Sequence, residues 1–372
     1  MDHSTWAKAV WDKITVKMDA QTRRMGAKIP YLTADGHYAD KMDDNIYWWC
    51  NGFWPGMLWL LHHGTGAALY ATAARAAEER LDAALAGYVG LHHDVGFQWN
   101  LSAVFNYRLT GDASARTRAL HAASLLAGRY NPRGKFIRSW NQDKTGWIII
   151  DCMMNLPLLY WASEESGDPR FGFIAIEHTE TAMKTLIRPD GSCNHIVSLC
   201  PETGAFLEAF GGQGYDKDSA WTRGQSWALY GFLLGYRHTG DVRYLDCSKR
   251  IAHYFIACVA QTGYVTRVDF RAPAEPIKLD TSAAMIAACG LLHLADVVPE
   301  HERPLYTNAA IAMLQAVEAD HCNWEPGYDS IVQNCTAQYH DRLEELHVSH
   351  IYADYFFVEA VHKLLHPDFK CW

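Results

Sequence analysis

The sequence predicts an all-α fold of the (α/α)6 toroid type, in which six inner helices form a barrel and six outer helices surround it. Three observations support this prediction. No sustained alternation of apolar and polar residues indicates strands. Glycines that end helices recur along the chain. Helices that are apolar on all sides alternate with helices that have a charged face. An open solenoid of helix pairs is the alternative.

Gly-Asp pairs mark the points where one helix ends and the next begins. They occur at Gly111-Asp112, Gly167-Asp168 and Gly240-Asp241, and Gly64 and Gly66 end an earlier helix. Glycine adopts the left-handed conformation at a helix C-cap without steric cost, and the aspartate side chain caps the following helix.

The inner helices are expected where apolar residues surround the helix on all sides, as in residues 57–61 and 285–292. They begin near Pro55, Phe97, Pro157, Trp227, Ser282 and Tyr355. The outer helices have charged faces, and they are expected at residues 5–24, 69–88, 113–130, 171–187, 242–260 and 303–319. No linker or low-complexity segment interrupts this alternation, so residues 1–372 are expected to form a single catalytic domain.

The composition argues against some classes of binding partner. The net charge is −9 with no basic run, which argues against nucleic acid or an anionic membrane surface as a partner. The chain contains 14 Trp and 19 Tyr, a content suited to an aromatic-lined cleft. An acidic ligand would therefore need local Arg or His side chains.

The cysteines and the N-terminus indicate a cytoplasmic protein. Ten cysteines occur without a CxxC pair, and several lie in apolar helical patterns, as reduced core cysteines do. The first residues contain no basic-then-apolar signal segment. The most apolar long stretch, residues 46–61, contains Asn51 and Pro55 and is too short to span a bilayer.

The segments that precede the inner helices are rich in residues suited to sugar binding. In a toroid these segments converge at one end of the barrel, where such residues would form a pocket. The candidate binding residues are Trp49, Phe53, His93, Phe97, Trp140, His195, Gln213, Trp221, Arg223, Trp227 and Tyr355. Arg223 lies in an aromatic-rich segment and could bind a carboxylate or form a structural salt bridge.

Two acids, Asp94 and Asp151, are the candidate catalytic residues. Asp151 lies in the apolar run 147–161, just before a helix that Pro157 is expected to begin. An unpaired buried carboxylate is costly and tends to hold a proton. The alternative is an aspartate that backbone N–H groups satisfy at a helix start. A carboxylate pair in an aromatic pocket suggests glycoside hydrolysis.

No metal site and no cofactor are expected. The pair His62-His63 and the other paired histidines belong to no HExxH motif and have no CxxC partner set.

Four motifs together resemble those of the unsaturated glucuronyl hydrolases, glycoside hydrolase family eighty-eight. They run in the family's order between about residues 40 and 360. The motifs are Trp49-x-x-Gly52-Phe53-Trp54-Pro55-Gly56, His93-Asp94-x-Gly96-Phe97, Ile150-Asp151-x-Met153-Met154-Asn155-Leu156-Pro157 and Trp221-x-Arg223-Gly224-Gln225-x-Trp227.

The resemblance implies an (α/α)6 fold and an unusual reaction. The substrate would carry a 4,5-unsaturated uronic acid at its non-reducing end, as left by a polysaccharide lyase. By resemblance, Asp151 protonates C4 of the vinyl ether and activates the water that adds at C5, and Asp94 orients the sugar. His195, Gln213 and Arg223 would hold the uronate carboxylate or the water, while the aromatic residues line the pocket.

Three other functions stay open at this point. One is an unsaturated rhamnogalacturonyl hydrolase, with the same chemistry on a pectin fragment. Another is an inverting glycosidase on the same toroid. The third is a carbohydrate-binding protein without catalytic activity. The identity of the oligosaccharide and its sulfation also stay open.

Overall fold

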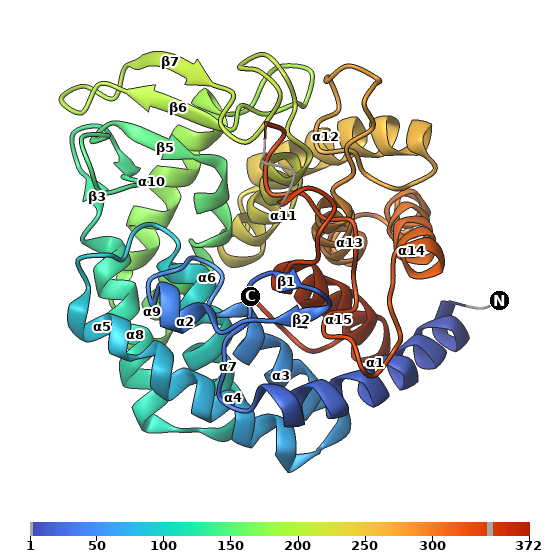
Figure 1. Cartoon of the computed structure of the whole chain (residues 1–372). Helices are drawn as coiled ribbons and strands as arrows, with labels where there is room; N and C mark the ends of the chain where they lie inside the picture. The colour runs from blue at the N-terminus through green and yellow to red at the C-terminus, as the bar shows by residue number, and fades with distance from the viewer. Residues whose placement is uncertain (1–2, 341–344) are drawn as a thin grey trace.

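The computed structural model describes residues 3–340 and 345–372, and within these residues the helices form two concentric rings (Figure 1). The inner ring consists of α3 (Phe53–Thr65), α6 (Val95–Trp99) with its continuation α7 (Phe105–Thr110), α9 (Pro157–Ser166), α11 (Thr222–Thr239), α13 (Thr281–Ala295) and α15 (Ile351–Leu365). The outer ring consists of α1 (His3–Met25), α4 (Ala68–Leu81), α8 (Ala113–Ala127), α10 (Pro169–Thr185), α12 (Val242–Val259) and α14 (Arg303–Asp320).

The inner ring is closed. Each inner helix packs against the next, and α15, the last of them, packs against α3, the first. The predicted toroid is therefore confirmed, and the open solenoid is wrong. The predicted outer helices agree with the structure to within a few residues except at the end of the second, where α4 stops at Leu81 and a short α5 (Ala83–Gly87) follows.

Two inner helices begin earlier than predicted. α11 begins at Thr222 rather than Trp227, and α15 begins at Ile351 rather than Tyr355. The first turn of α11 holds the polar residues Arg223 and Gln225, which resemble loop residues in the sequence although both are buried. Their partners lie in distant segments, so the sequence pattern alone does not reveal them.

The expectation of few strands needs one correction. A three-stranded antiparallel sheet, β5 (Trp147–Ile149), β6 (Ile196–Leu199) and β7 (Phe206–Phe210), lies over one end of the ring (Figure 1). Two short hairpins, β1 (Thr33–Ala34) with β2 (His37–Tyr38) and β3 (Tyr130–Asn131) with β4 (Phe136–Ile137), complete the strands of the described residues. These strands are too short to produce a detectable alternation of side chains.

A short 3-10 helix, η2 (Ile150–Met154), lies between two inner helices at unusually close range. A Cβ atom added at Gly96 of α6 would lie 2.4 Å from Asn155 Cα, and one added at Gly231 of α11 would lie 2.4 Å from Met153 Cβ. Side chains are therefore excluded at both glycines, and their absence lets η2 pack against the two helices.

The remaining short helices are α2 (Lys41–Asp44) and η3 (Ala260–Thr262), together with η1 (Asn100–Val104), a π-helical stretch that joins α6 to α7. Among the described helices, none combines the length and the apolar character that crossing a bilayer requires.

We expect Gly96→Ala to lower the free energy of unfolding by about 1–3 kcal/mol, measured by urea denaturation, because the new methyl group forces backbone apart. Gly235→Ala is the matched control in α11, where the added Cβ meets nothing closer than 3.4 Å. Alanine is the better helix former, so the control should be neutral or stabilising by up to about 1 kcal/mol. Equal effects of the two substitutions would contradict the close packing of η2.

Candidate active site

A pocket of about 310 Å³ opens at the end of the ring where the inner helices begin. The segments before those helices supply most of its walls, as the sequence predicted. The lining residues are Tyr31, Trp48, Trp49, His92, His93, Asp94, Trp140, Ile149, Asp151, His195, Gln213, Arg223, Ala337, Gln338, Glu345 and Tyr352.

Asp151 is held by the junction of sheet and helix. Ile149 pairs with Ile196 across β5 and β6, and the N–H of Ile150 donates to the carbonyl of His195 over 3.0 Å. This pairing brings Asp151, in the first turn of η2, beside His195. The His195 Nε2 atom lies 3.6 Å from Asp151 Oδ2, and that oxygen is buried without a hydrogen-bond partner among the described residues.

The surroundings of His195 fix its tautomer. The backbone N–H of Gln213 donates to His195 Nδ1 over 2.9 Å, so Nδ1 acts as the acceptor and Nε2 carries the proton. The ring centroids of Trp221 and His195 are 4.2 Å apart, so the indole packs against the imidazole. His195 therefore presents an N–H group toward Asp151.

Asp94, at the start of α6, is a charged acid. Its Oδ1 accepts a hydrogen bond from Asn155 Nδ2 over 3.2 Å, and its Oδ2 lies 3.1 Å from His92 Nδ1 and 3.5 Å from His93 Nε2. Burial raises the pKa of Asp94, but His93, His92 and Asn155 outweigh burial and hold this pKa below its ordinary value. Burial lowers the pKa of His93 to about 4. At neutral pH the pair is thus a carboxylate beside a neutral imidazole.

Asn155 connects the two acids. Its Oδ1 accepts a hydrogen bond from the N–H of Phe97 over 2.7 Å, and its Nδ2 donates to both Asp94 Oδ1 and the carbonyl of Asp151. One fully buried amide therefore sets the relative position of α6 and η2. Asn155 was not predicted to belong to the site, although a polar amide inside an apolar run is a signal of such a role.

Arg223 is already paired. Its Nη1 lies 2.6 Å from Asp280 Oδ2 and also donates to the carbonyl of Thr336, while Nη2 donates to the carbonyl of Ala337. Both charged side chains are at most 2% exposed. Arg223 lines the pocket, so its predicted contact with the substrate stays a prediction. The salt bridge left open by the sequence is present, with a partner 57 residues away.

The predicted binding residues fall into two groups. The structure brings Trp49, His93, Trp140, His195, Gln213 and Arg223 together around the pocket. The other five do not line it: Phe53, Phe97, Trp221, Trp227 and Tyr355. These five were expected to line the pocket, and the structure places them outside its lining.

The physical reason is the face of the inner helices on which these side chains lie. Phe53, Phe97, Trp227 and Tyr355 are fully buried and point into the barrel. Their rings interlock, with centroids 5.3 Å apart for Phe53 and Phe97 and 5.1 Å apart for Phe97 and Trp227. They support the pocket floor from below.

Eight lining residues were not predicted from the sequence: Tyr31, Trp48, His92, Ile149, Ala337, Gln338, Glu345 and Tyr352. Trp48 and His92 adjoin residues that were chosen, so the repeated pairs Trp48-Trp49 and His92-His93 were an available signal. Tyr31 lies far from any inner helix in the sequence and offered none.

One group of potential metal ligands lies in the pocket. His92, His93 and Asp94 offer three ligand atoms within 4.8 Å of one another. The contacts of both imidazoles with the Asp94 carboxylate account for this cluster without an ion.

Comparisons with known proteins agree on one family. The profile of Glycosyl Hydrolase Family 88 matches residues 22–320. The unsaturated glucuronyl hydrolase of Bacillus sp. strain GL1 is 34% identical, covering 96% of each chain. The unsaturated chondroitin disaccharide hydrolase of Streptococcus pyogenes serotype M1 is 31% identical, covering 94% of this chain and 90% of that protein. A solved structure of UGL with dGlcA-Glc-Rha-Glc has a TM-score of 0.91 at 32% identity, covering 97% of both chains.

We expect Asp280→Asn to lower the free energy of unfolding by about 3–5 kcal/mol, because it leaves the Arg223 charge buried without its partner. Glu318→Gln is the control. It breaks the Lys13–Glu318 pair, in which Lys13 is 50% exposed, and should cost less than about 1 kcal/mol. Urea denaturation of both variants measures the difference. A loss of unfolding free energy no larger than that of the control would show that Asp280 does not neutralise Arg223.

Proposed function

Because the chain belongs to glycosyl hydrolase family 88, we propose that it releases a 4,5-unsaturated uronic acid from the non-reducing end of lyase-generated oligosaccharides. The chain is a glycoside hydrolase, and the described residues would act as one catalytic domain. The observation that carries the proposal is Asp151 Oδ2, a buried carboxylate oxygen without a hydrogen-bond partner among the described residues, at the wall of an aromatic pocket.

The proposed reaction begins with proton transfer from the Asp151 carboxyl group to C4. The electron pair of the C4=C5 bond forms the new C–H bond, and positive charge develops at C5 and the ring oxygen. The resulting carboxylate then takes a proton from water as the water oxygen adds to C5. The hemiketal collapses, the ring opens, and the aglycone leaves with a proton.

His195 has a positioning role in this scheme. Its Nε2–H points at the Asp151 carboxyl group from 3.6 Å, a distance that substrate binding can close to a hydrogen bond. A donor there stabilises the carboxylate that forms once the proton has moved to C4. The same N–H is close enough to help hold the attacking water.

Asp94 would bind the sugar rather than donate the proton. Its lowered pKa keeps it ionised at neutral pH, so it accepts hydrogen bonds from ring hydroxyls and donates none. Asn155 fixes it relative to Asp151, which orients the double bond over the acid.

The pocket must also bind the carboxylate group of the uronic acid. Arg223 is neutralised by Asp280, so the pocket meets an anion mainly with neutral donors. We propose that the side-chain amide of Gln213, which donates to the carbonyl of Ala337 and has a second N–H, supplies such a donor, with the paired Arg223 at the edge. Trp49 and Trp140 offer ring faces against which sugars stack.

The named relatives favour lyase products of glycosaminoglycans as substrates, and one of them is named for chondroitin disaccharides. We propose this class for the present chain. An assay with unsaturated disaccharides from hyaluronan, chondroitin and heparin, beside the tetrasaccharide dGlcA-Glc-Rha-Glc, ranks the candidates by kcat/KM.

A reducing compartment such as the cytoplasm is the proposed location. All ten cysteines are unpaired in the structure, and seven of them are buried: Cys50, Cys152, Cys193, Cys247, Cys289, Cys335 and Cys371. Free buried cysteines are typical of proteins kept under reducing conditions.

We expect Asp151→Asn to reduce kcat by about 10²–10⁴-fold or more, because the variant lacks the proton donor and the base. The loss of ultraviolet absorbance of the unsaturated uronate measures turnover. Asp218→Asn, an exposed loop acid, is the control and should retain activity. Turnover near that of the unmodified protein in Asp151→Asn would overturn the assignment. A product that keeps its ring would indicate ordinary glycoside hydrolysis.

The acid limb of the pH–rate profile should report Asp94. A carboxylate whose pKa is lowered stays charged until the pH falls below the ordinary aspartate value of about 3.9, so kcat/KM should decline only below about pH 4. His92→Ala removes one group that lowers this pKa, so the limb should move to higher pH. The exposed His121→Ala is the control. A limb that stays in place in His92→Ala would show that Asp94 does not set it.

A further inference from the structure

Three histidines converge at the end of the ring opposite the pocket. α3 and α15 both begin beside the pocket and end away from it. His63 lies in the last turn of α3, His362 lies in the last turn of α15, and His366 caps that helix. None of the three takes part in the reaction proposed above.

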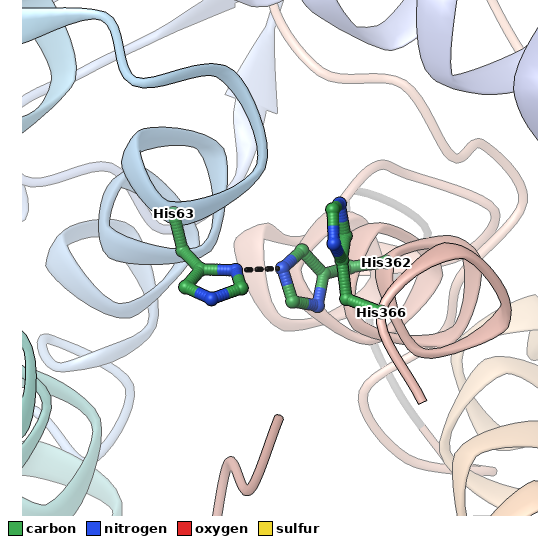
Figure 2. A group of neighbouring side chains, drawn as sticks. All are labelled: His63, His362 and His366. Carbon is green, nitrogen blue, oxygen red and sulfur yellow. Dashed lines mark hydrogen bonds between the residues drawn. The ribbon is translucent and has the colours of Figure 1, made fainter. Parts of the chain in front are cut away.

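Figure 2 shows ring nitrogens of His63 and His362 directed at each other, with the His366 ring beside that of His362. Each offers one ring nitrogen, and these three nitrogens lie within 4.8 Å of one another. His63 Nδ1 and His362 Nε2 are 2.9 Å apart. His362 and His366 are four residues apart on one helix, a spacing that places both side chains on the same face.

A single hydrogen bond between two imidazoles does not account for the cluster. It pairs His63 with His362 but gives His366 no role.

The distances suit a tetrahedral ion. Zinc binds imidazole nitrogen at about 2.0–2.1 Å, which places neighbouring ligand nitrogens about 3.3 Å apart. The present separations, from 2.9 Å to at most 4.8 Å, bracket that value. Small side-chain rotations would therefore form the site.

The surroundings allow access and a fourth ligand. His63 is exposed and His366 is half-buried, while Phe369 packs 4.2 Å from the His63 ring. A hollow of about 410 Å³ lies beside them and is also lined by Asp368. Water or the Asp368 carboxylate could complete the coordination from that side.

We propose that His63, His362 and His366 form a binding site for a divalent transition-metal ion, with zinc as the ion that three imidazoles and one oxygen ligand suit best. The ion would tie α3 to α15. These are the first and last inner helices, and their ligands are 299 residues apart in the chain. The site would therefore lock the junction that closes the ring.

The test uses untagged protein freed of metal with a chelator. Titration with Zn²⁺ by calorimetry gives the affinity and the stoichiometry, and Co²⁺ serves as a spectroscopic probe of tetrahedral nitrogen ligation. We compare the original protein with His63→Ala and His366→Ala, in which the substituted side chains are not fully buried. His121→Ala, an exposed histidine on α8, is the matched control.

The original protein and His121→Ala should bind one equivalent of Zn²⁺, and His63→Ala and His366→Ala should bind it at least about tenfold more weakly. Saturating Zn²⁺ should raise the Tm of the original protein by about 3 °C and leave the Tm of the two ligand variants unchanged. Equal affinity in all four proteins would overturn the proposal. So would loss of binding in Asp94→Asn alone, because the ion would then occupy the His92–His93–Asp94 group.

Discussion

The site depends on one buried amide. Asn155 is fully buried, and through three hydrogen bonds it joins the first turn of an inner helix to the 3-10 helix that carries Asp151. An unsatisfied amide at this depth would be costly, so all three partners are fixed together. The glycines at 96 and 231 allow the backbones to approach, and the amide selects one relative position among those that close packing allows.

Pairing and burial remove much of the charge in the pocket. The strong cation of the pocket, Arg223, is cancelled by Asp280, and the histidine beside Asp94 is held neutral by burial. Asp94 remains as a carboxylate that its neighbours hold ionised. A pocket of this kind recognises an anionic sugar through oriented dipoles, which remain in place when a proton moves.

Most of the fold could be predicted from the sequence because the signals are local. Apolar periodicity and Gly-Asp stops report on residues within one or two helical turns, and they located all six helix pairs.

The site could be predicted only in part, because its geometry is set by distant partners. Asp94 and Asp151 stand out as acids among apolar neighbours. The pairing of Arg223 with Asp280, the position of His195 beside Asp151 and the inward direction of Phe53 and Trp227 all require the closed ring. The three histidines of α3 and α15 are further apart still, so no motif search would join them.

The close contact of η2 with its two flanking helices has a consequence for how such a protein diversifies. The segment that carries the acid is bounded by backbone on both sides, so almost any change there disturbs the barrel itself. The opposite rim, formed by Ala337, Gln338 and Glu345, and the loop that holds Trp140 belong to no inner helix. Substitutions at the rim are therefore expected to disturb the barrel less than substitutions in η2.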